Sequence, residues 1–216
     1  ASMNKIKVLL VDDHTVVRTG FKLLLTAAVP NIEIVAEADR GELAIQLYQN
    51  HQPDIIVMDL SMPGIGGLET IKRIIQRDET ANILVFSVHD EQVYVQRALN
   101  AGAKGYITKN SAPDILPEAI TSILQGQPYI EQGLLRENTE QPSNHDYQLV
   151  ITAFSVREFD IFSLLAKGLT AHKIADELCL GYKTVANYVT QIKKKLHVSS
   201  IAELAHIAVM LGIMKH

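Results

Sequence analysis

The sequence predicts two domains: an α/β domain with a doubly wound, five-stranded parallel sheet, and a smaller all-α domain of four helices. Two observations support this fold class. In the first 125 residues, short aliphatic and β-branched runs alternate with segments of helical periodicity, which is typical of βαβ units. Beyond residue 150 only helical periodicity remains. A chain of 216 residues is long enough for two domains of modest size.

The predicted strands of the first domain are short and apolar. They span 5–11, 32–38, 54–59, 82–88 and 104–108. The runs around 8–11, 55–58 and 83–86 are continuously apolar, as expected of central strands that helices cover on both faces. The predicted helices of this domain span 14–28, 41–50, 66–77, 91–101 and 112–125.

A polar stretch separates the two domains. Residues 136–146, RENTEQPSNHD, lack periodicity and contain Pro142, which is typical of a linker. Beyond it, helices are predicted over 155–167, 171–178, 182–196 and 200–211. Ser155, with Glu158 three residues later, has the spacing of a capping box and marks the start of the first of these helices. The predicted boundaries are a domain over 3–128, a linker over 129–149 and a domain over 150–216.

Composition and charge narrow the classes of function. No apolar run approaches the roughly 20 residues of a membrane span, and we expect neither a secretory leader nor a membrane partner. The single cysteine, Cys179, excludes an internal disulfide and fits a reducing cytoplasm, and its apolar surroundings predict that it is buried. Residues 1–130 hold 11 Lys and Arg against 15 Asp and Glu, whereas 151–216 hold 8 against 5. The basic second domain makes nucleic acid a candidate partner.

Polar side chains stand where the predicted strands end. Asp12 and Asp13 follow the first strand, and Asp59 ends the third. Because the carboxyl ends of parallel strands meet at one edge of a sheet, we expect these carboxylates to share a crevice with Ser87 and Lys109. Three carboxylates repel one another unless a cation joins them. A hard divalent ion with oxygen ligands, above all Mg²⁺, resolves this repulsion.

This set of residues suits phosphoryl transfer. Asp59 is the predicted nucleophile, because it precedes LSMPGIGG, a loop whose glycines and proline leave the carboxylate and the backbone open to a phosphate. Asp12 and Asp13 are predicted to hold the metal, which together with the lysine neutralises the transferred group. An aspartate at a strand end is more often a cap or a turn residue, but five suitable residues at the correct strand ends are hard to explain by chance. His14 and His89 flank the site at no spacing typical of metal ligands, and we expect surface roles for both.

Four motifs of the first domain carry a resemblance to a known family. They are VDDH at 11–14, DLSMPGIGG at 59–67, Ser87, and GAKGYITK at 102–109. Residues 5–125 resemble the receiver domain of a bacterial two-component response regulator. The resemblance implies a flavodoxin-like sheet of strand order 2-1-3-4-5 and transfer of a phosphoryl group to Asp59 from a phosphohistidine on a sensor histidine kinase. It also implies a Mg²⁺ ligand from the backbone carbonyl of Ser61, and switch roles for Ser87 and Tyr106.

The basic segment 169–196 predicts a helix-turn-helix. It pairs a short helix with a longer one across a glycine turn. Apolar spacing predicts burial of Ile174, Ala175, Leu178, Val185, Val189, Ile192 and Leu196. The opposite face combines lysines, which contact phosphates, with Asn and Gln, which read base edges. The alternative is a plain amphipathic helix whose lysine run is a solvated face.

Residues 154–211 resemble the LuxR/NarL-type four-helix DNA-binding domain. The segments FSVREFDIFSLLAKGLTAHKIADEL and KTVANYVTQIKKKL carry this resemblance. The predicted DNA contacts are Lys183, Thr184, Ala186, Asn187, Thr190, Gln191, Lys194 and Lys195. The order of the two domains resembles the NarL/FixJ class of transcription regulators. That resemblance implies a protein that regulates promoters and forms a homodimer when phosphorylated or on double-stranded DNA.

Two other functions can be tested against the same residues of the sequence. A phosphatase of the haloacid-dehalogenase type would also use an aspartate nucleophile, but on the first strand and with a second Asp two residues later. Asp12 is followed at once by Asp13, and Thr15 is not acidic, so this pattern fails. A receiver-like protein that never accepts phosphate would act by protein contact alone, and the intact acceptor, serine and lysine argue against it. We therefore expect no enzyme activity beyond the receiver's own phosphorylation and dephosphorylation.

Overall fold

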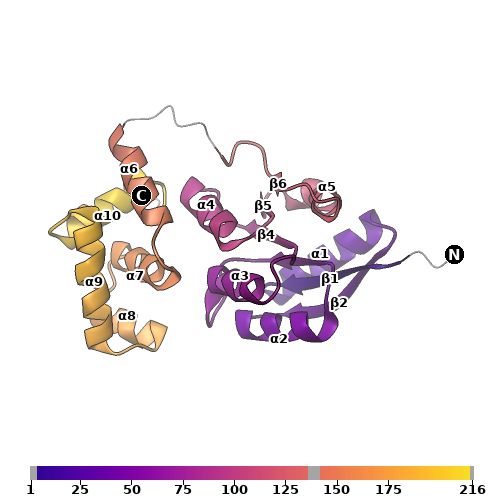
Figure 1. The fold of residues 1–216 in the computed structure, drawn as a ribbon, viewed down its shortest axis with the longest axis horizontal. Helices are drawn as coiled ribbons and strands as arrows, with labels where there is room; N and C mark the ends of the chain where they lie inside the picture. Colours follow the sequence, from indigo (N-terminus) through magenta and orange to yellow (C-terminus); the bar gives the residue numbers. More distant parts are fainter. Residues whose placement is uncertain (1–3, 136–141, 215–216) are drawn as a thin grey trace. The chain divides into compact units, whose positions relative to one another are not determined.

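The chain forms two compact units, Ala1–Leu135 and Arg136–His216 (Figure 1). This computed structural model describes residues 4–135 and 142–214. Within those residues, no helix combines the length and the apolar character that crossing a bilayer requires.

The first unit contains a parallel sheet with strand order β2-β1-β3-β4-β5-β6. The strands are β1 (Ile6–Val11), β2 (Ile32–Ala38), β3 (Ile55–Met58), β4 (Ile83–Ser87), β5 (Gly105–Thr108) and β6 (Tyr129–Ile130). The predicted order of the first five strands is confirmed, and the predicted count of five is wrong by one. β6 has only two residues, which is too short to show a periodicity in the sequence.

β6 is held by contacts with distant residues. It pairs in parallel with β5, with Tyr129 opposite Gly105 and Ile130 opposite Tyr106. The Glu131 carboxylate, which follows β6, accepts a hydrogen bond from the Thr108 backbone N–H at 2.7 Å. These contacts fix the sixth strand to the end of β5, inside the range that the sequence assigns to the linker.

Five helices cover the sheet. They are α1 (Thr15–Ala28), α2 (Gly41–His51), α3 (Gly66–Arg77), α4 (Gln92–Ala101) and α5 (Ala112–Leu124). The helices α1 and α5 pack on one face, and α2, α3 and α4 lie along the other (Figure 1). The core on the α1–α5 side includes Val8, Leu10, Phe21, Leu25, Val57, Phe86, Leu116 and Ile120. This two-sided cover explains why the runs 8–11, 55–58 and 83–86 of the central strands are continuously apolar.

The second unit is helical. Its elements are α6 (Pro142–Thr152), α7 (Val156–Ala166), α8 (Ala171–Leu178), α9 (Tyr182–Leu196) and α10 (Ile201–Met210). The four predicted helices correspond to α7–α10, and α6 is additional. α6 begins at a proline, which a first helical turn tolerates, but its sequence has no apolar stripe that would reveal it. The predicted linker over 129–149 thus contains β6 and most of α6, and its residues 136–141 lie outside the described residues.

The predicted capping box starts α7. The Ser155 side chain accepts from the Glu158 backbone N–H at 3.1 Å, and the Glu158 carboxylate accepts from the Ser155 backbone N–H at 3.1 Å. Behind this cap, Ile174 of α8 and Val185 and Ile192 of α9 are fully buried, as their spacing predicts. Of the predicted apolar stripe, Leu178 and Val189 are only partly buried.

Candidate functional site

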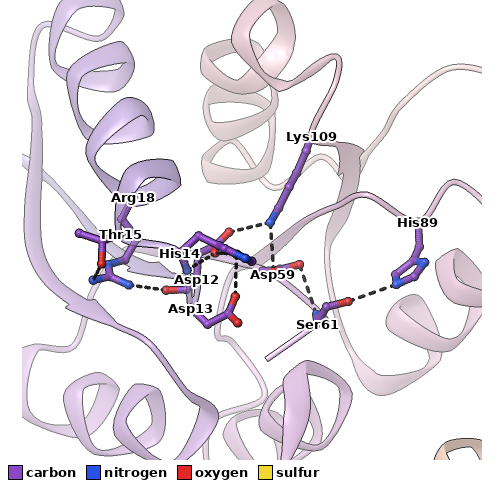
Figure 2. A network of polar contacts seen from close by, with 9 residues as sticks. All are labelled: Asp12, Asp13, His14, Thr15, Arg18, Asp59, Ser61, His89 and Lys109. Carbon is purple, nitrogen blue, oxygen red and sulfur yellow. Dashed lines mark hydrogen bonds and ion pairs between the residues drawn. The ribbon is translucent and has the colours of Figure 1, made fainter. Parts of the chain in front are cut away.

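Residues from three strand ends meet at the carboxyl edge of the sheet (Figure 2). The Lys109 ammonium lies 2.8 Å from Asp12 Oδ2 and 3.1 Å from Asp59 Oδ2. Both carboxylates are buried, with 0% exposure for Asp12 and 1% for Asp59. The strand ladder sets these positions, because the Asp59 backbone N–H donates to the Val11 carbonyl and the Asp12 N–H donates to the Ala38 carbonyl. The predicted convergence of these three side chains is therefore present in the structure.

The charges of this cluster do not balance. Burial raises the pKa of the Asp59 carboxyl above its ordinary value, although the neighbouring Lys109 ammonium acts in the opposite direction. Burial also acts to lower the pKa of Lys109, but its hydrogen bonds with Asp12 and Asp59 and their charges outweigh that effect and raise it. One ammonium thus serves two buried carboxylates. A site of this kind attracts a further cation.

The oxygen donors fit a hard divalent metal ion. Ligand atoms of Asp12, Asp13, His14 and Asp59 all lie within 4.8 Å of one another. Three of the four residues supply carboxylate oxygens, the donors that Mg²⁺ prefers, and one of the three, Asp13, is exposed. Ser61, whose carbonyl is the predicted fourth ligand, lies next to the cluster and donates its backbone N–H to Asp59 Oδ1 at 3.2 Å.

The loop after β3 passes close to the Asp59 backbone. A Cβ atom on Gly67 would lie 2.6 Å from the Leu60 Cα and 2.7 Å from the Asp59 carbonyl oxygen. Only glycine fits at such a distance from backbone atoms. Gly64 and Gly66 have φ values of +79° and +77°, in the region that glycine adopts most readily. The glycines of LSMPGIGG therefore allow the loop to fold back beside the carboxylate.

The two predicted switch residues contact the same neighbour. Ser87 is buried at the end of β4, and its hydroxyl accepts from the His89 backbone N–H at 3.1 Å. The Tyr106 ring is fully buried, and its hydroxyl donates to the His89 carbonyl at 2.7 Å. Burial raises the pKa of the Tyr106 phenol well above its ordinary value, so this hydroxyl keeps its proton and acts as a donor.

Both histidines beside the site belong to its polar network (Figure 2). The His14 Nδ1 lies 3.1 Å from Asp12 Oδ1 and 2.9 Å from Asp13 Oδ1. The His89 Nε2 lies 3.1 Å from the Ser61 hydroxyl. The sequence predicts surface roles for both residues. His14 is exposed, as expected, and His89 is partly buried, but each also contacts residues of the site. His14 stands two residues after Asp12, a spacing that could have indicated contact, whereas no local pattern links His89 with Ser61.

The second unit presents a polar face on α9. The predicted contacts Lys183, Thr184, Asn187, Thr190, Gln191 and Lys194 are exposed, and Ala186 is partly buried. A stack of the His172 and Tyr182 rings, 4.0 Å between centroids, joins α8 to the start of α9. Cys179, which the sequence predicts to be buried, is exposed, because it ends α8 in a left-handed conformation with φ of +54°. The exposed face of α9 has the residue types that a DNA groove requires.

Lys195 differs from the other predicted contacts. Its ammonium lies 2.6 Å from the Glu158 carboxylate and 5.9 Å from the centre of the Phe154 ring. The pKa of Glu158 lies below its ordinary value, because the bonds from Lys195 and Ser155 outweigh the effect of burial. Lys195 thus has an internal partner that the sequence does not reveal.

Comparisons with known proteins cover both units. Residues 8–121 match the response regulator receiver domain, and residues 152–208 match the bacterial regulatory proteins of the luxR family. The transcriptional activator protein ExaE of Pseudomonas putida is 41% identical over 212 residues, which is 96% of this chain and 98% of that protein. The response regulator GacA of Pseudomonas aeruginosa is 36% identical over 212 residues, 97% and 98% of the respective chains.

A solved structure shares the fold. RcsB from Salmonella enterica serovar Typhimurium, bound to promoter rprA in the presence of the phosphomimetic BeF₃⁻, is 22% identical with a TM-score of 0.66. The likeness covers 94% of this chain and 98% of that chain. The two-unit order is therefore shared along nearly the whole length of the chain.

Proposed function

This chain belongs to the two-component response regulators with a LuxR-type DNA-binding domain, and from that premise we propose that Asp59 is its phosphoryl acceptor. The observation that carries the proposal is the Lys109 ammonium held between the buried carboxylates of Asp12 and Asp59. An ammonium in this position can neutralise charge on a phosphoryl group at Asp59. The receiver domain implies a sensor histidine kinase as the donor.

In the proposed reaction, an Asp59 carboxylate oxygen attacks the phosphorus of a phosphohistidine. The new phosphorus–oxygen bond forms as the phosphorus–nitrogen bond breaks, and the electron pair stays on the kinase imidazole. Lys109 keeps its contact with the acceptor and faces the charge that arrives. The Ser87 hydroxyl, at the end of the next strand, can donate to a phosphoryl oxygen. A Mg²⁺ ion held by Asp12, Asp13, Asp59 and the Ser61 carbonyl would supply further positive charge to the phosphoryl oxygens.

We infer that phosphorylation acts on the face formed by β4 and β5. If Ser87 turns toward the phosphoryl group, its bond from the His89 N–H is lost and the β4–α4 loop is free to rearrange. Tyr106 is anchored to that same loop through the His89 carbonyl. A charge added at Asp59 therefore reaches a buried aromatic side chain through few contacts.

For the second unit, we propose that α9 enters the major groove of promoter DNA. In this proposal its exposed Lys183 and Lys194 would contact phosphates, while the exposed amides of Asn187 and Gln191 would read base edges. One such unit makes few phosphate contacts and binds weakly, which favours a homodimer on two half-sites. We propose that a protein which binds promoter DNA in this way acts in the cytoplasm, and that it has no catalytic role beyond gain and loss of its own phosphoryl group.

Chemical phosphorylation tests the acceptor. The full-length chain, incubated with a small phosphodonor and Mg²⁺, should gain one acid-labile, hydroxylamine-sensitive phosphoryl group. Asp59→Asn should abolish this label, because the amide is not a nucleophile. Asp39→Asn is the matched control, since it changes an exposed aspartate that pairs only locally with Arg40. A label that persists in Asp59→Asn would remove this residue from the proposed role.

A further inference from the structure

His89 connects the loop after Asp59 with both predicted switch residues. Its N–H donates to Ser87 Oγ at 3.1 Å, and its carbonyl accepts from the Tyr106 hydroxyl at 2.7 Å. Its side chain reaches the other way, with Nε2 3.1 Å from the Ser61 hydroxyl. Ser61 in turn donates its N–H to Asp59 Oδ1 at 3.2 Å (Figure 2). A continuous chain of hydrogen bonds therefore runs from the acceptor to Tyr106.

The position of the imidazole is restricted. Its ring stacks on Tyr94 of α4, with centroids 4.1 Å apart and planes 9° from parallel. The Glu91 carboxylate lies 3.8 Å from its other nitrogen, Nδ1. The ring therefore stands between α4 and Ser61, and the hydrogen bond to Ser61 forms at a small cost in side-chain entropy.

We propose that His89 is a positioning residue that couples the phosphoryl group on Asp59 to the buried position of Tyr106, through the bond between its imidazole and Ser61. The inference rests on the proposed function, because it needs Asp59 as the acceptor. When Ser87 turns toward the phosphoryl group, the His89 backbone loses one attachment. The hydrogen bond between the imidazole and Ser61 is a second attachment. It holds the His89 carbonyl, which accepts the Tyr106 hydroxyl, in a fixed position relative to the loop after Asp59.

Linkage makes this coupling measurable. A group at Asp59 that stabilises the buried Tyr106 must itself bind more tightly when Tyr106 is buried, by the same factor. Loss of the imidazole breaks the connection between the group at Asp59 and the buried Tyr106. It should therefore weaken the binding of a phosphoryl analogue and lower the share of buried Tyr106 in the protein that carries the analogue.

The probe is beryllofluoride with Mg²⁺, added to the full-length chain and followed by NMR of the tyrosine rings, with Tyr106→Phe used for assignment. His89→Ala should weaken beryllofluoride binding about threefold to tenfold, the size expected for one hydrogen bond. Ser61→Ala should have a similar effect. The double variant should bind no more weakly than the weaker single variant, because both changes remove the same bond. The proposed coupling would be overturned if the effects of the two single changes multiply in the double variant. It would also be overturned if His89→Ala leaves the affinity for beryllofluoride unchanged.

Two further variants distinguish a loss of this coupling from a general disturbance of the fold. His89→Gln carries an amide that reaches the position of Nε2, so it should recover part of the affinity that His89→Ala loses. His51→Ala removes an exposed imidazole at the end of α2, at the opposite edge of the sheet, and should leave the affinity unchanged. A wild-type chain that neither binds beryllofluoride nor gains a phosphoryl group would refute the proposed function, and this inference with it. Wild-type binding that His89→Ala leaves intact would refute the inference alone.

Discussion

The Lys195 ammonium lies 2.6 Å from the Glu158 carboxylate, and this ion pair fastens the last turn of α9 to the first turn of α7. The same carboxylate accepts the Ser155 backbone N–H, so one buried side chain completes a helix cap and holds a second helix. Lys194 and Lys195 are both exposed, but Lys195 differs in that its ammonium is paired with Glu158.

Lys195→Met and Lys194→Met should have different effects. Lys195→Met leaves Glu158 without its cation and should lower the unfolding free energy of the second unit by about 1–2 kcal/mol. Lys194→Met should leave stability unchanged and reduce the slope of log affinity against log salt by about 1. Urea unfolding and DNA titrations at several salt concentrations measure both effects. Equal loss of salt dependence in the two variants would contradict the assignment of Lys194 to DNA and of Lys195 to Glu158.

The cap should make the second unit sensitive to acid. The folded pKa of Glu158 lies below its ordinary value, so its contribution to stability is present above the unfolded pKa of about 4.3. That contribution is lost as pH falls through the folded value. The unfolding free energy of the second unit should therefore decline below about pH 4, and Glu158→Gln should flatten this decline. An equally steep decline in the variant would assign the acid sensitivity to other carboxylates.

Removal of the cation at the acceptor should destabilise the first unit. Lys109→Met leaves the buried carboxylates of Asp12 and Asp59 without the ammonium that they share, which should cost about 3–5 kcal/mol of unfolding free energy near neutral pH. Adding Asp59→Asn to that variant removes one of the two charges and should restore part of the loss. Chemical unfolding of the single and double variants measures both steps. A double variant less stable than Lys109→Met would show that carboxylate repulsion is not the cause.

Mg²⁺ should stabilise the first unit through Asp12, Asp13 and Asp59. At a hundred times its dissociation constant, a ligand that binds only the folded state adds about 2.7 kcal/mol. Asp13→Asn should raise the Mg²⁺ concentration needed for this gain, because one carboxylate ligand is lost. Calorimetric unfolding at increasing Mg²⁺ follows the change, with Asp39→Asn as a control that leaves the response intact. A response that Asp13→Asn does not alter would exclude this residue as a ligand.

Base recognition should depend on the exposed amide of Asn187. Asn187→Ala should reduce discrimination between operator variants by about 1–3 kcal/mol at one base position. Non-specific binding, which depends on the lysines, should change little. Titrations against a set of single-base operator variants test this. A uniform loss of affinity for all sequences would indicate a phosphate contact in place of base readout.

The acceptor cluster could be predicted from the sequence because topology alone brings it together. Asp12, Asp59 and Lys109 each follow a strand of a parallel sheet, and the carboxyl ends of such strands share an edge. Apolar runs reveal the strands, so the residues after them are identified at once. The exposed face of α9 could also be predicted, because apolar residues recur along that helix with a period of 3.6 residues.

Other features depend on contacts between distant residues that no local pattern records. β6 exists because two residues pair with β5, and α6 lacks an apolar stripe. The bond between Ser61 and His89 joins loops 28 residues apart, and the Lys195–Glu158 pair joins residues 37 apart. Three consecutive lysines look alike in a sequence, and only the packing of α7 against α9 distinguishes the last of them.

Asp12 and Lys109 stand 97 positions apart in the sequence, and this separation has a consequence for protein synthesis. A ribosome adds both aspartates to the chain before it adds the lysine whose ammonium lies between their carboxylates. An unfinished chain, or a copy in which β5 has not yet joined the sheet, holds a nucleophile without its cation. We expect such molecules to be poor phosphoryl acceptors, because they lack the ammonium that neutralises the transferred group in the proposed reaction.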